Sequence, residues 1–574
     1  MSLNGPAIKL LTTELKNNLV GARVDKIYQE NKNISMHIRS GKENLILCFS
    51  FSADTPAIYI TNNKQSYPDE PPMFCMLLRK YLIGSRILDV NQIRLDRIIS
   101  IKFSSSADIY STDELNLQFE IMGKYSNLIL LNPNTNEIID SLIRVYPDMS
   151  SVRLVLPKEK YVLPEPNGLN PLSVNREDIY NALESNQMQK LKTSIFKSFE
   201  GINPDISSYI LNLSNIDSDR NFNNLNDDEK NILIDTIQNT FDKIKNNDLE
   251  AIVYNKDDIP SKLSAFDLSP SYIDGIHFDT MNDAVRYFYE TKSNHKLISS
   301  RTHELRKKIL KRVQNLEKTL NVQQVEYEKS KDRENIKIQA DLLAANIYKI
   351  NRGDKSIDVN NFYSENNEII KIKLDDSLSP KQNVERLYNR YNKLKNRELN
   401  LERRIPSIKN EIYYLKSVVI NLEQAETTDE INQIKTELMD IGFLNRSSSK
   451  KKIRETKLSY REFTSPSGFK ILAGRNNIQN DKLTFKTAHK DDLWFHIRNE
   501  PGTHVILESH NQEVKDEDII AAANIAAVLS GKTVKSDIDY TTVKNVKKIK
   551  NKNPGLVNYY NYNTITVDPD SKNM

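Results

Sequence analysis

Heptad spacing of apolar residues in two separate stretches constrains the fold of this chain most. In the first stretch, apolar residues follow one another at intervals of three or four: Leu305, Ile309, Val313, Leu316 and Leu320. The second stretch has the same spacing over Leu401, Ile405, Ile408, Ile412, Leu415, Val419 and Leu422. Such residues form one apolar stripe along an α-helix, and a partner helix must cover it. The two stretches therefore predict a coiled coil.

The segment between the two stretches cannot continue a helix. Its sequence, "INRGDKSIDVNNFYSENNEIIKIKLDDSLSP", combines strand-like pieces with Gly, Asn and Pro. We expect 292–435 to form an antiparallel pair of long helices with a small folded tip at about 340–380. Pro406 is expected to kink the second helix or open it locally, because proline lacks the N–H that a helix needs. A coiled coil between two copies of the chain is the alternative.

The rest of the chain divides into three regions. Residues 1–172 alternate like strands, with one amphipathic helix near "PPMFCMLLRKYLIGSRI". Residues 178–290 are helical, and "FKSFEGINPDISSYIL" is typical of a helix-hairpin-helix, which can hold a phosphate backbone, or of an ordinary turn. Residues 446–574 begin with a basic linker, "RSSSKKKIRETKLSYR", and continue with predicted strands at "GFKILAGR", "LTFKTA", "LWFHI", "HVILE" and "DIDYTTV" and a helix from Asp516. The predicted fold class is multidomain α+β.

Composition limits the classes of function. A length of 574 residues predicts several domains, and a net charge of +4 means that any positive surface for nucleic acid must be local. The two cysteines, Cys48 and Cys75, lie in apolar runs and are interpreted as reduced thiols. No apolar run is long enough to span a membrane, and the first residues lack an apolar signal core. We therefore expect a cytoplasmic protein without membrane partners.

The segment "DDLWFHIRNEPGTHVIL" contains the only tryptophan, Trp494, with His496 and His504 nearby. A metal site is not predicted, because no third ligand has the usual spacing. Acid/base catalysis is not predicted either, because no nucleophile or substrate cradle accompanies the histidines. Two interpretations stay open: strand residues that pack a small core, and recognition of a polyanion.

Recognition of RNA is favoured by the residue types around this segment. Lys and Arg neutralise phosphates, Asn forms hydrogen bonds, and Trp, Tyr and His stack on unpaired bases. Candidate RNA contacts in the C-terminal region are Arg475, Asn476, Asn477, Trp494, His496, Arg498, His504, Lys544, Lys547 and Lys548. In the N-terminal region, Lys124 and Asn127 lie at a predicted turn within "EIMGKYSNLILL". Asp96 and Arg97 start a predicted strand, where a local ion pair is the ordinary interpretation.

Several segments together resemble the NFACT family. They are "PPMFCMLLRKYL", "LDRIISIKF", "EIMGKYSNLILL", "GRNNIQNDKLTFKTAHKDDLWFHIRNEPGTHVIL" and "DYTTVKNVKKIKNKNPGLVNYY". The resemblance covers nearly the whole chain and implies an NFACT-N domain, a helix-hairpin-helix domain, a coiled coil and an NFACT-R domain, in that order. The family's Asp–Arg pair, which is needed for tailing, falls on Asp96 and Arg97.

What the family resemblance implies is ribosome-associated quality control. Such a factor binds the large (50S) ribosomal subunit obstructed by peptidyl-tRNA, recruits tRNA and promotes alanine tailing of stalled nascent chains. Implied partners are 23S rRNA, the stalk base, peptidyl-tRNA, tRNA-Ala and a small RNA-binding cofactor of tailing. The ribosome would form the peptide bonds, so no catalytic residue, cofactor or metal is expected in this chain.

Two observations qualify the resemblance. Asn4 stands where many relatives carry Asp. The N-terminal half is also similar in layout to formamidopyrimidine-type DNA glycosylases, but Ser2 and Leu3 replace the proline and glutamate that those enzymes need. The alternative functions are a fibronectin-binding surface adhesin and a coiled-coil RNA-binding scaffold.

Overall fold

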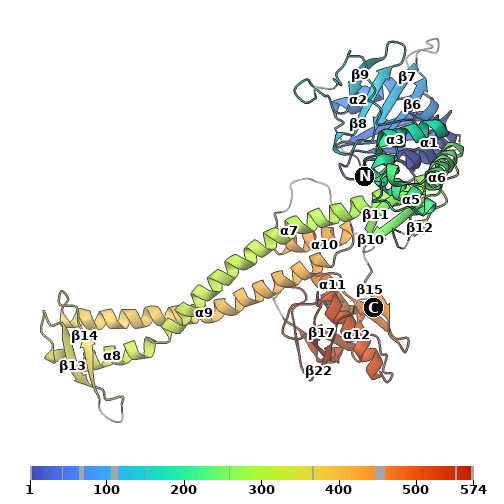
Figure 1. Ribbon diagram of the computed structural model, residues 1–574. Coiled ribbons are helices and arrows are strands. Elements are labelled where there is room, and N and C mark those ends of the chain that lie inside the picture. The colour runs from blue at the N-terminus through green and yellow to red at the C-terminus, as the bar shows by residue number, and fades with distance from the viewer. Residues whose placement is uncertain are drawn as a thin grey trace. The chain divides into compact units, whose positions relative to one another are not determined.

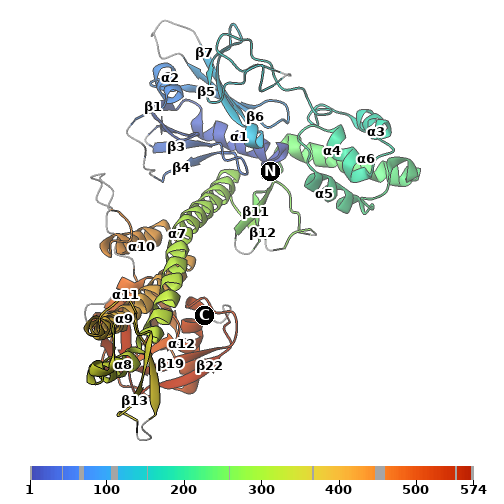
Figure 2. The same ribbon diagram turned by 90° about the vertical axis from the view of Figure 1, so that its left-hand side faces the viewer.

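The computed structural model describes residues 3–41, 43–63, 67, 70–104, 114–150, 153–256, 259–269, 271–273, 275–364, 368–445, 459–549 and 553–570. The chain forms two units, Met1–Ser293 and Asn294–Met574. Both mix helices with antiparallel sheets, so the predicted multidomain α+β class is confirmed (Figures 1 and 2). Within the described residues, no helix is both long and apolar enough to cross a membrane.

The first unit begins with a helix that the sequence analysis missed, α1 (Gly5–Leu19). The Asn4 side chain caps it by accepting a hydrogen bond from the Ala7 N–H at 3.0 Å. Leu11, Leu15 and Leu19 are buried on one face. The prediction of only one helix in this region was wrong, because this four-residue spacing was not recognised as helical.

Two antiparallel sheets, each with its strands in chain order, follow α1. The first sheet consists of β1 (Arg23–Glu30), β2 (Asn33–Ser40), β3 (Glu43–Ser50) and β4 (Ala57–Thr61). The second consists of β5 (Ile87–Gln92), β6 (Ile98–Ser104), β7 (Glu114–Glu120), β8 (Asn127–Asn132) and β9 (Glu137–Ser141). The predicted helix α2 (Met73–Leu82) lies between the two sheets in the sequence. Alternating strand residues bury one hydrophobic core with α1 and α2.

Four helices come next: α3 (Arg176–Ser185), α4 (Leu191–Ser198), α5 (Pro204–Ser214) and α6 (Asp227–Asn246). The helix-hairpin-helix shape is confirmed: α4 and α5 are joined by a turn in which Gly201 has a φ of +75°. A three-stranded sheet, β10 (Ile252–Lys256), β11 (Ile259–Ser264) and β12 (Gly275–His277), was not predicted. Its strands are short and fall in a segment that was interpreted as helical throughout.

The long helix α7 (Met281–Ser330) starts before the predicted beginning of the coiled coil at 292. Its first turn is fixed to the first unit, because the Glu14 carboxylate accepts hydrogen bonds from the Met281 and Asn282 N–H groups, both at 2.8 Å. The Asn282 side chain also pairs with the backbone of Ile60 on the edge strand β4, at 2.7 and 3.1 Å.

The second unit contains the predicted coiled coil, formed within one chain by α7 and α9 (Pro380–Glu423). Figure 1 shows these helices side by side. Ion pairs set an antiparallel register, because the partner number falls as the residue number rises: Arg306–Glu423, Arg312–Glu411 and Glu326–Arg397. Residues of both heptad stripes share one buried cluster. α9 runs through Pro406 as one helix, so it does not open there.

A small folded tip joins the two long helices, as predicted. It consists of α8 (Arg333–Ala345) and a hairpin of β13 (Ser356–Asn360) and β14 (Ile369–Lys373), with its own hydrophobic core. A further helix, α10 (Thr428–Asp440), follows α9 and packs against it.

The C-terminal region is a six-stranded antiparallel sheet in the order β15-β16-β18-β17-β19-β22, packed against α12 (Asp516–Leu529). Its strands are β15 (Arg461–Thr464), β16 (Lys470–Ala473), β17 (Leu493–Ile497), β18 (Val505–Leu507), β19 (Ser536–Thr542) and β22 (Asn563–Val567). The predicted strand "LTFKTA" is wrong, because α11 (Asn477–Lys482) continues into a π-helical turn at Leu483–Thr487. Most of the predicted basic linker, 446–458, lies outside the described residues.

Candidate nucleic-acid interface

Asp96 and Arg97 lie in a tight turn between β5 and β6. The turn is closed by the Asp96 N–H, which donates to the Ile93 carbonyl at 3.0 Å. The Asp96 carboxylate accepts from the Arg97 N–H at 2.7 Å. Gln92 ties the turn to the start of α1, because its Nε2 donates to the Asp96 and Gly5 carbonyls at 2.8 and 3.0 Å. These hydrogen bonds fix the backbone of the turn. The side chains of Asp96 and Arg97, which were predicted to bind tRNA, are half-buried.

The helix-hairpin-helix turn approaches this Asp96 turn very closely. The Gly5 N–H donates to the Gly201 carbonyl at 3.1 Å. A Cβ on Gly201 would lie 2.2 Å from the Leu95 carbonyl oxygen, and one on Gly5 would lie 2.5 Å from the same atom. Only glycine fits at either position. Three segments that are far apart in the sequence are thus fixed in contact: the start of α1, the Asp96 turn and the turn between α4 and α5.

A cavity of about 700 Å³ opens where these segments meet. Asp96 and Arg97 line it together with residues that the sequence analysis did not single out: Glu165, Glu200, Asn203, Asp205 and Lys262. Lys262 forms an ion pair with Asp205. Asn4 also lines the cavity, but its side-chain oxygen is used in capping α1. Since Asp caps a helix as well as Asn does, Asn4 keeps the cap and removes a charge from the cavity.

Glu200 is the most deeply buried carboxylate in this lining, with 2% of the residue exposed. Nη2 of Arg94 lies 3.3 Å from one of its oxygens. No described residue donates a hydrogen bond to either oxygen. Burial raises the pKa of Glu200, Arg94 opposes the rise, and the nearby Asp96 carboxylate adds to it.

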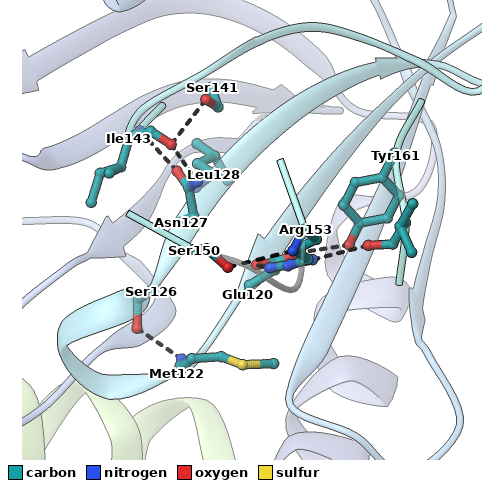
Figure 3. A network of polar contacts seen from close by, with 11 residues as sticks. Glu120, Met122, Ser126, Asn127, Leu128, Ser141, Ile143, Ser150, Arg153 and Tyr161 are labelled. Atoms are coloured by element: carbon teal, nitrogen blue, oxygen red, sulfur yellow. Dashed lines mark hydrogen bonds and ion pairs between the residues drawn. The ribbon is translucent and has the colours of Figure 1, made fainter. Parts of the chain in front are cut away.

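The segment "EIMGKYSN" forms one wall of the cavity through Met122. Figure 3 shows the polar network behind it: Arg153 and Tyr161 converge on the buried Glu120, with the Tyr161 hydroxyl 2.8 Å from the carboxylate. The Ser126 hydroxyl accepts from the Met122 N–H at 2.9 Å. These contacts fix the backbone on which Met122 reaches the cavity.

Lys124 and Asn127 differ in what they offer to RNA. Asn127 was predicted as a contact, but it is buried and its amide is used up by the Ile143 backbone, donating at 2.7 Å and accepting at 2.9 Å. That prediction was wrong, because the side chain closes the fold between β8 and the end of β9. Lys124 is exposed and lies against the ring of Tyr125, so it stays a candidate.

Trp494, His496 and His504 were predicted as RNA contacts, but all three are buried. The Trp494 ring stacks on His496 at 5.4 Å and meets the His504 ring edge-on at 5.3 Å. The His504 Nδ1 lies 2.8 Å from the Thr484 hydroxyl. Burial lowers the pKa of both histidines, that of His504 to about 3, so both are neutral. These residues build a second small core beneath the sheet.

Arg475, Asn476 and Asn477 were also predicted as RNA contacts, and the structure places them in a joint with α9 and α10. Arg475 forms an ion pair with Glu430, and Asn476 donates to Gln433 at 3.0 Å. Asn477 donates to both Ser417 and Glu437 at 3.0 Å. The two asparagines are buried and cannot reach RNA. Local sequence could not reveal this, because every partner precedes the motif by many residues.

Exposed basic residues remain on the hairpin of β20 (Val546–Lys548) and β21 (Val557–Tyr559). Lys544, Lys547 and Lys548 are exposed there, and Lys547 lies over the ring of the exposed Tyr560. Lys544 and Lys548 form ion pairs with Asp491 and Asp481, which nucleic-acid phosphates would have to replace. Arg498 is exposed after β17. Lys550 and Lys552, from the same run, lie outside the described residues.

Comparison with known families gives two matches that together span almost the whole chain. A family model described as the NFACT N-terminal and middle domains matches 5–457, and one described as the NFACT protein RNA binding domain matches 459–561. The chain belongs to the NFACT family. The first NFACT match ends, and the second begins, in the segment that was predicted as a linker.

Curated relatives extend over the same length. "Rqc2 homolog RqcH" of Bacillus subtilis is 31% identical, covering 100% of this NFACT chain and 98% of the relative. "Archaeal Rqc2 homolog aRqcH" of Methanocaldococcus jannaschii is 26% identical, covering 89% of this chain and 78% of the relative. The solved N-terminal part of the fibronectin/fibrinogen-binding protein of Streptococcus suis is 27% identical with a TM-score of 0.42, covering 50% of this chain and 99% of that one.

The predicted contact residues of this NFACT chain thus include a half-buried pair, an exposed basic set and a buried set. Asp96 and Arg97 line the cavity of the first unit, and Lys544, Lys547 and Lys548 lie on the hairpin of the second. The buried set supports the fold. Within the described ranges, no group of three or more His, Cys, Asp or Glu side chains could hold a metal ion.

Proposed function

We propose that this NFACT protein is a ribosome-associated quality control factor. It binds the 50S subunit obstructed by peptidyl-tRNA, recruits tRNA and promotes the addition of alanine to the stalled chain without mRNA. The full-length similarity to proteins named Rqc2 homolog RqcH and the match to an RNA-binding domain support the ribosome quality control role. The ribosome forms the peptide bonds in this proposal, and the protein positions tRNA.

The observation that supports tRNA binding most is the meeting of two elements in one cavity. The Asp96 turn and the helix-hairpin-helix turn both line it, although they are separated by about a hundred residues of sequence. Arg97 supplies positive charge for phosphates, and Lys262 would do so in exchange for its ion pair with Asp205. The other carboxylates and Asn203 supply hydrogen-bonding groups for bases.

The other parts of the chain suit binding to a large ribonucleoprotein. α9 contains 44 residues, which at a rise of 1.5 Å each span about 65 Å. The coiled coil is therefore long enough for its tip to contact the stalk base of the 50S subunit while its other end lies about 65 Å away. The exposed lysines of the β20–β21 hairpin would contact rRNA or tRNA phosphates, with an affinity that falls as salt is raised.

The test is affinity purification of the full chain from cells, followed by sequencing of the bound RNA. We expect large-subunit rRNA together with one tRNA species, which names the amino acid that is added. Replacing Asp96 and Arg97 by alanine should remove the tRNA and abolish tailing. The matched control replaces Asp242 and Lys243, an adjacent acid–base pair exposed on α6.

Either of two results would refute the proposal. RNA no more abundant than in a mock purification would favour the coiled-coil scaffold or the adhesin. Full tRNA recovery with the Asp96 and Arg97 variant would show that the cavity is not the tRNA site. Circular dichroism of each variant distinguishes loss of binding from loss of folding. If the Asp96 and Arg97 variant is unfolded, these two residues have a structural role.

A further inference from the structure

The helix α1 connects the cavity to the start of α7 within the first unit. At its start, Leu3 and Asn4 line the cavity, and the Gly5 N–H donates to the Gly201 carbonyl at 3.1 Å. In its third turn, the Glu14 carboxylate reaches the first residues of α7. At a rise of 1.5 Å per residue, Asn4 and Glu14 are about 15 Å apart. One helix therefore contributes both to the cavity and to the base of a coiled-coil helix.

The contact at Glu14 satisfies two backbone groups of α7. The first N–H groups of an α-helix have no partner inside the helix. In α7 the Met281 and Asn282 N–H groups donate to the two oxygens of Glu14, one to each, at 2.8 Å. The carboxylate also lies at the positive end of the helix dipole, and hydrogen bonds to a charged acceptor are stronger than those between neutral groups. If α1 moves away, the first turn of α7 loses both acceptors.

The same movement of α1 would disrupt the cavity. Gly5 lies so close to Gly201 and Leu95 that an added Cβ would overlap with both. The Gln92 side chain donates to the Gly5 and Asp96 carbonyls, so it joins the start of α1 to the Asp96 turn. Because α1 is a single helix whose apolar face is buried along its length, we expect it to open as a cooperative unit.

We propose that Glu14 is a positioning residue that couples RNA binding in the cavity to the order of the first turn of α7. This inference rests on the proposed function, because it takes the ligand of the cavity to be tRNA. A ligand that binds only the assembled cavity shifts the local opening equilibrium by mass action. Each segment that opens together with the cavity is stabilised by the same factor. Bound tRNA therefore reduces fraying at the base of the coiled-coil helix.

Other contacts hold α7 to the first unit without involving α1. The Asn282 side chain pairs with the backbone of Ile60 at 2.7 and 3.1 Å. One turn later along the same side, the Glu290 carboxylate accepts from the Thr61 hydroxyl at 3.4 Å. Both partners belong to β4. A substitution of Glu14 therefore removes the connection to α1 while these contacts keep α7 attached.

The experiment measures hydrogen exchange of the full chain with and without a tRNA-Ala transcript. Peptides from 90–100 and 195–210 report binding in the cavity, and peptides from 281–290 report the coupling. With tRNA present at about a hundred times its Kd, we expect exchange to slow in all three segments by up to about a hundredfold. A purely structural contact at Glu14 would leave exchange in 281–290 independent of tRNA.

Two variants distinguish coupling from direct contact between tRNA and α7. Glu14→Gln keeps the size of the side chain but replaces one acceptor by a donor, so it cannot accept from both N–H groups. In this variant tRNA should still slow exchange in the cavity segments, but no longer in 281–290. The matched control, Glu290→Gln, removes a carboxylate that contacts β4 and should keep the slowing in 281–290. Slowing in 281–290 that persists in Glu14→Gln would contradict the proposal.

Failure of the inference and failure of the proposed function are distinguishable in the unaltered protein. If tRNA slows exchange in the cavity segments but not in 281–290, the coupling is refuted and the proposed function stands. If tRNA changes exchange in none of the three segments, the cavity is not the tRNA site and both are refuted.

Discussion

Replacing Gly201 by alanine tests whether the close approach of the two turns builds the cavity. The added Cβ would lie 2.2 Å from the Leu95 carbonyl oxygen, and the residue has a φ of +75°. The left-handed backbone costs about 1–2 kcal/mol for a residue with a Cβ. The overlap with a backbone atom that cannot move aside adds about 1–3 kcal/mol. We expect Gly201→Ala to lower the local stability by about 2–5 kcal/mol, the sum of these two terms.

Gly21 provides the matched control for this substitution. It has a φ of +84°, but nothing lies within 4 Å of an added Cβ, so Gly21→Ala carries the backbone cost alone. Hydrogen exchange measured on peptides from 1–20, 90–100 and 195–210 reports the local opening free energy in the intact chain. Gly201→Ala should accelerate exchange in all three segments and weaken RNA binding. Equal effects of the two substitutions would refute the close-approach argument.

Three further variants test the second unit. Asn477→Ala removes two hydrogen bonds of the buried joint and should cost about 1–3 kcal/mol, seen as faster hydrogen exchange in α10 and α11 with RNA affinity retained. Replacing Lys547 and Lys548 by alanine should weaken RNA binding and reduce the slope of log affinity against log salt by about 2, while the fold is unchanged. The pKa of His504 is about 3 in the folded protein and has the ordinary value of 6.5 in the unfolded chain. Neutral His504 therefore contributes to the free energy of unfolding above pH 6.5, and this contribution is lost as the pH falls toward 3. We expect the free energy of unfolding to fall by about 2 kcal/mol between pH 7 and about pH 5. Urea unfolding followed by the fluorescence of Trp494, the only tryptophan in the sequence, measures this change. The His504→Gln variant should lack this pH dependence.

The candidate site could be predicted only in part from the sequence. Asp96 and Arg97 were found through the family resemblance, and the exposed lysines through their local clustering. Glu200 and Lys262 had no local signal, because each becomes part of a site only when the helix-hairpin-helix turn and β11 meet the Asp96 turn. The short distances among Gly5, Leu95 and Gly201 depend on backbone packing across the whole first unit.

The sequence also could not separate polar residues that bind a partner from polar residues that hold the fold together. Asn477 and Lys547 belong to equally suggestive motifs, yet Asn477 is buried against α9 and α10 while Lys547 is exposed. The same holds for Trp494 and His504, which were left open between core and RNA contact. Burial is a property of the assembled chain, and no short window of sequence contains it.

The sequence by itself determined the elements whose signal is periodic. The heptad stripes specified a coiled coil, and the alternating strands specified most of the N-terminal sheets, because side-chain spacing along a helix or strand is fixed by its local geometry. The tertiary structure alone decided which charged and amide groups face solvent, which form the joint of the C-terminal domain, and which surround the cavity. Those outcomes depend on partners contributed by distant segments, and only packing brings such partners within hydrogen-bonding distance.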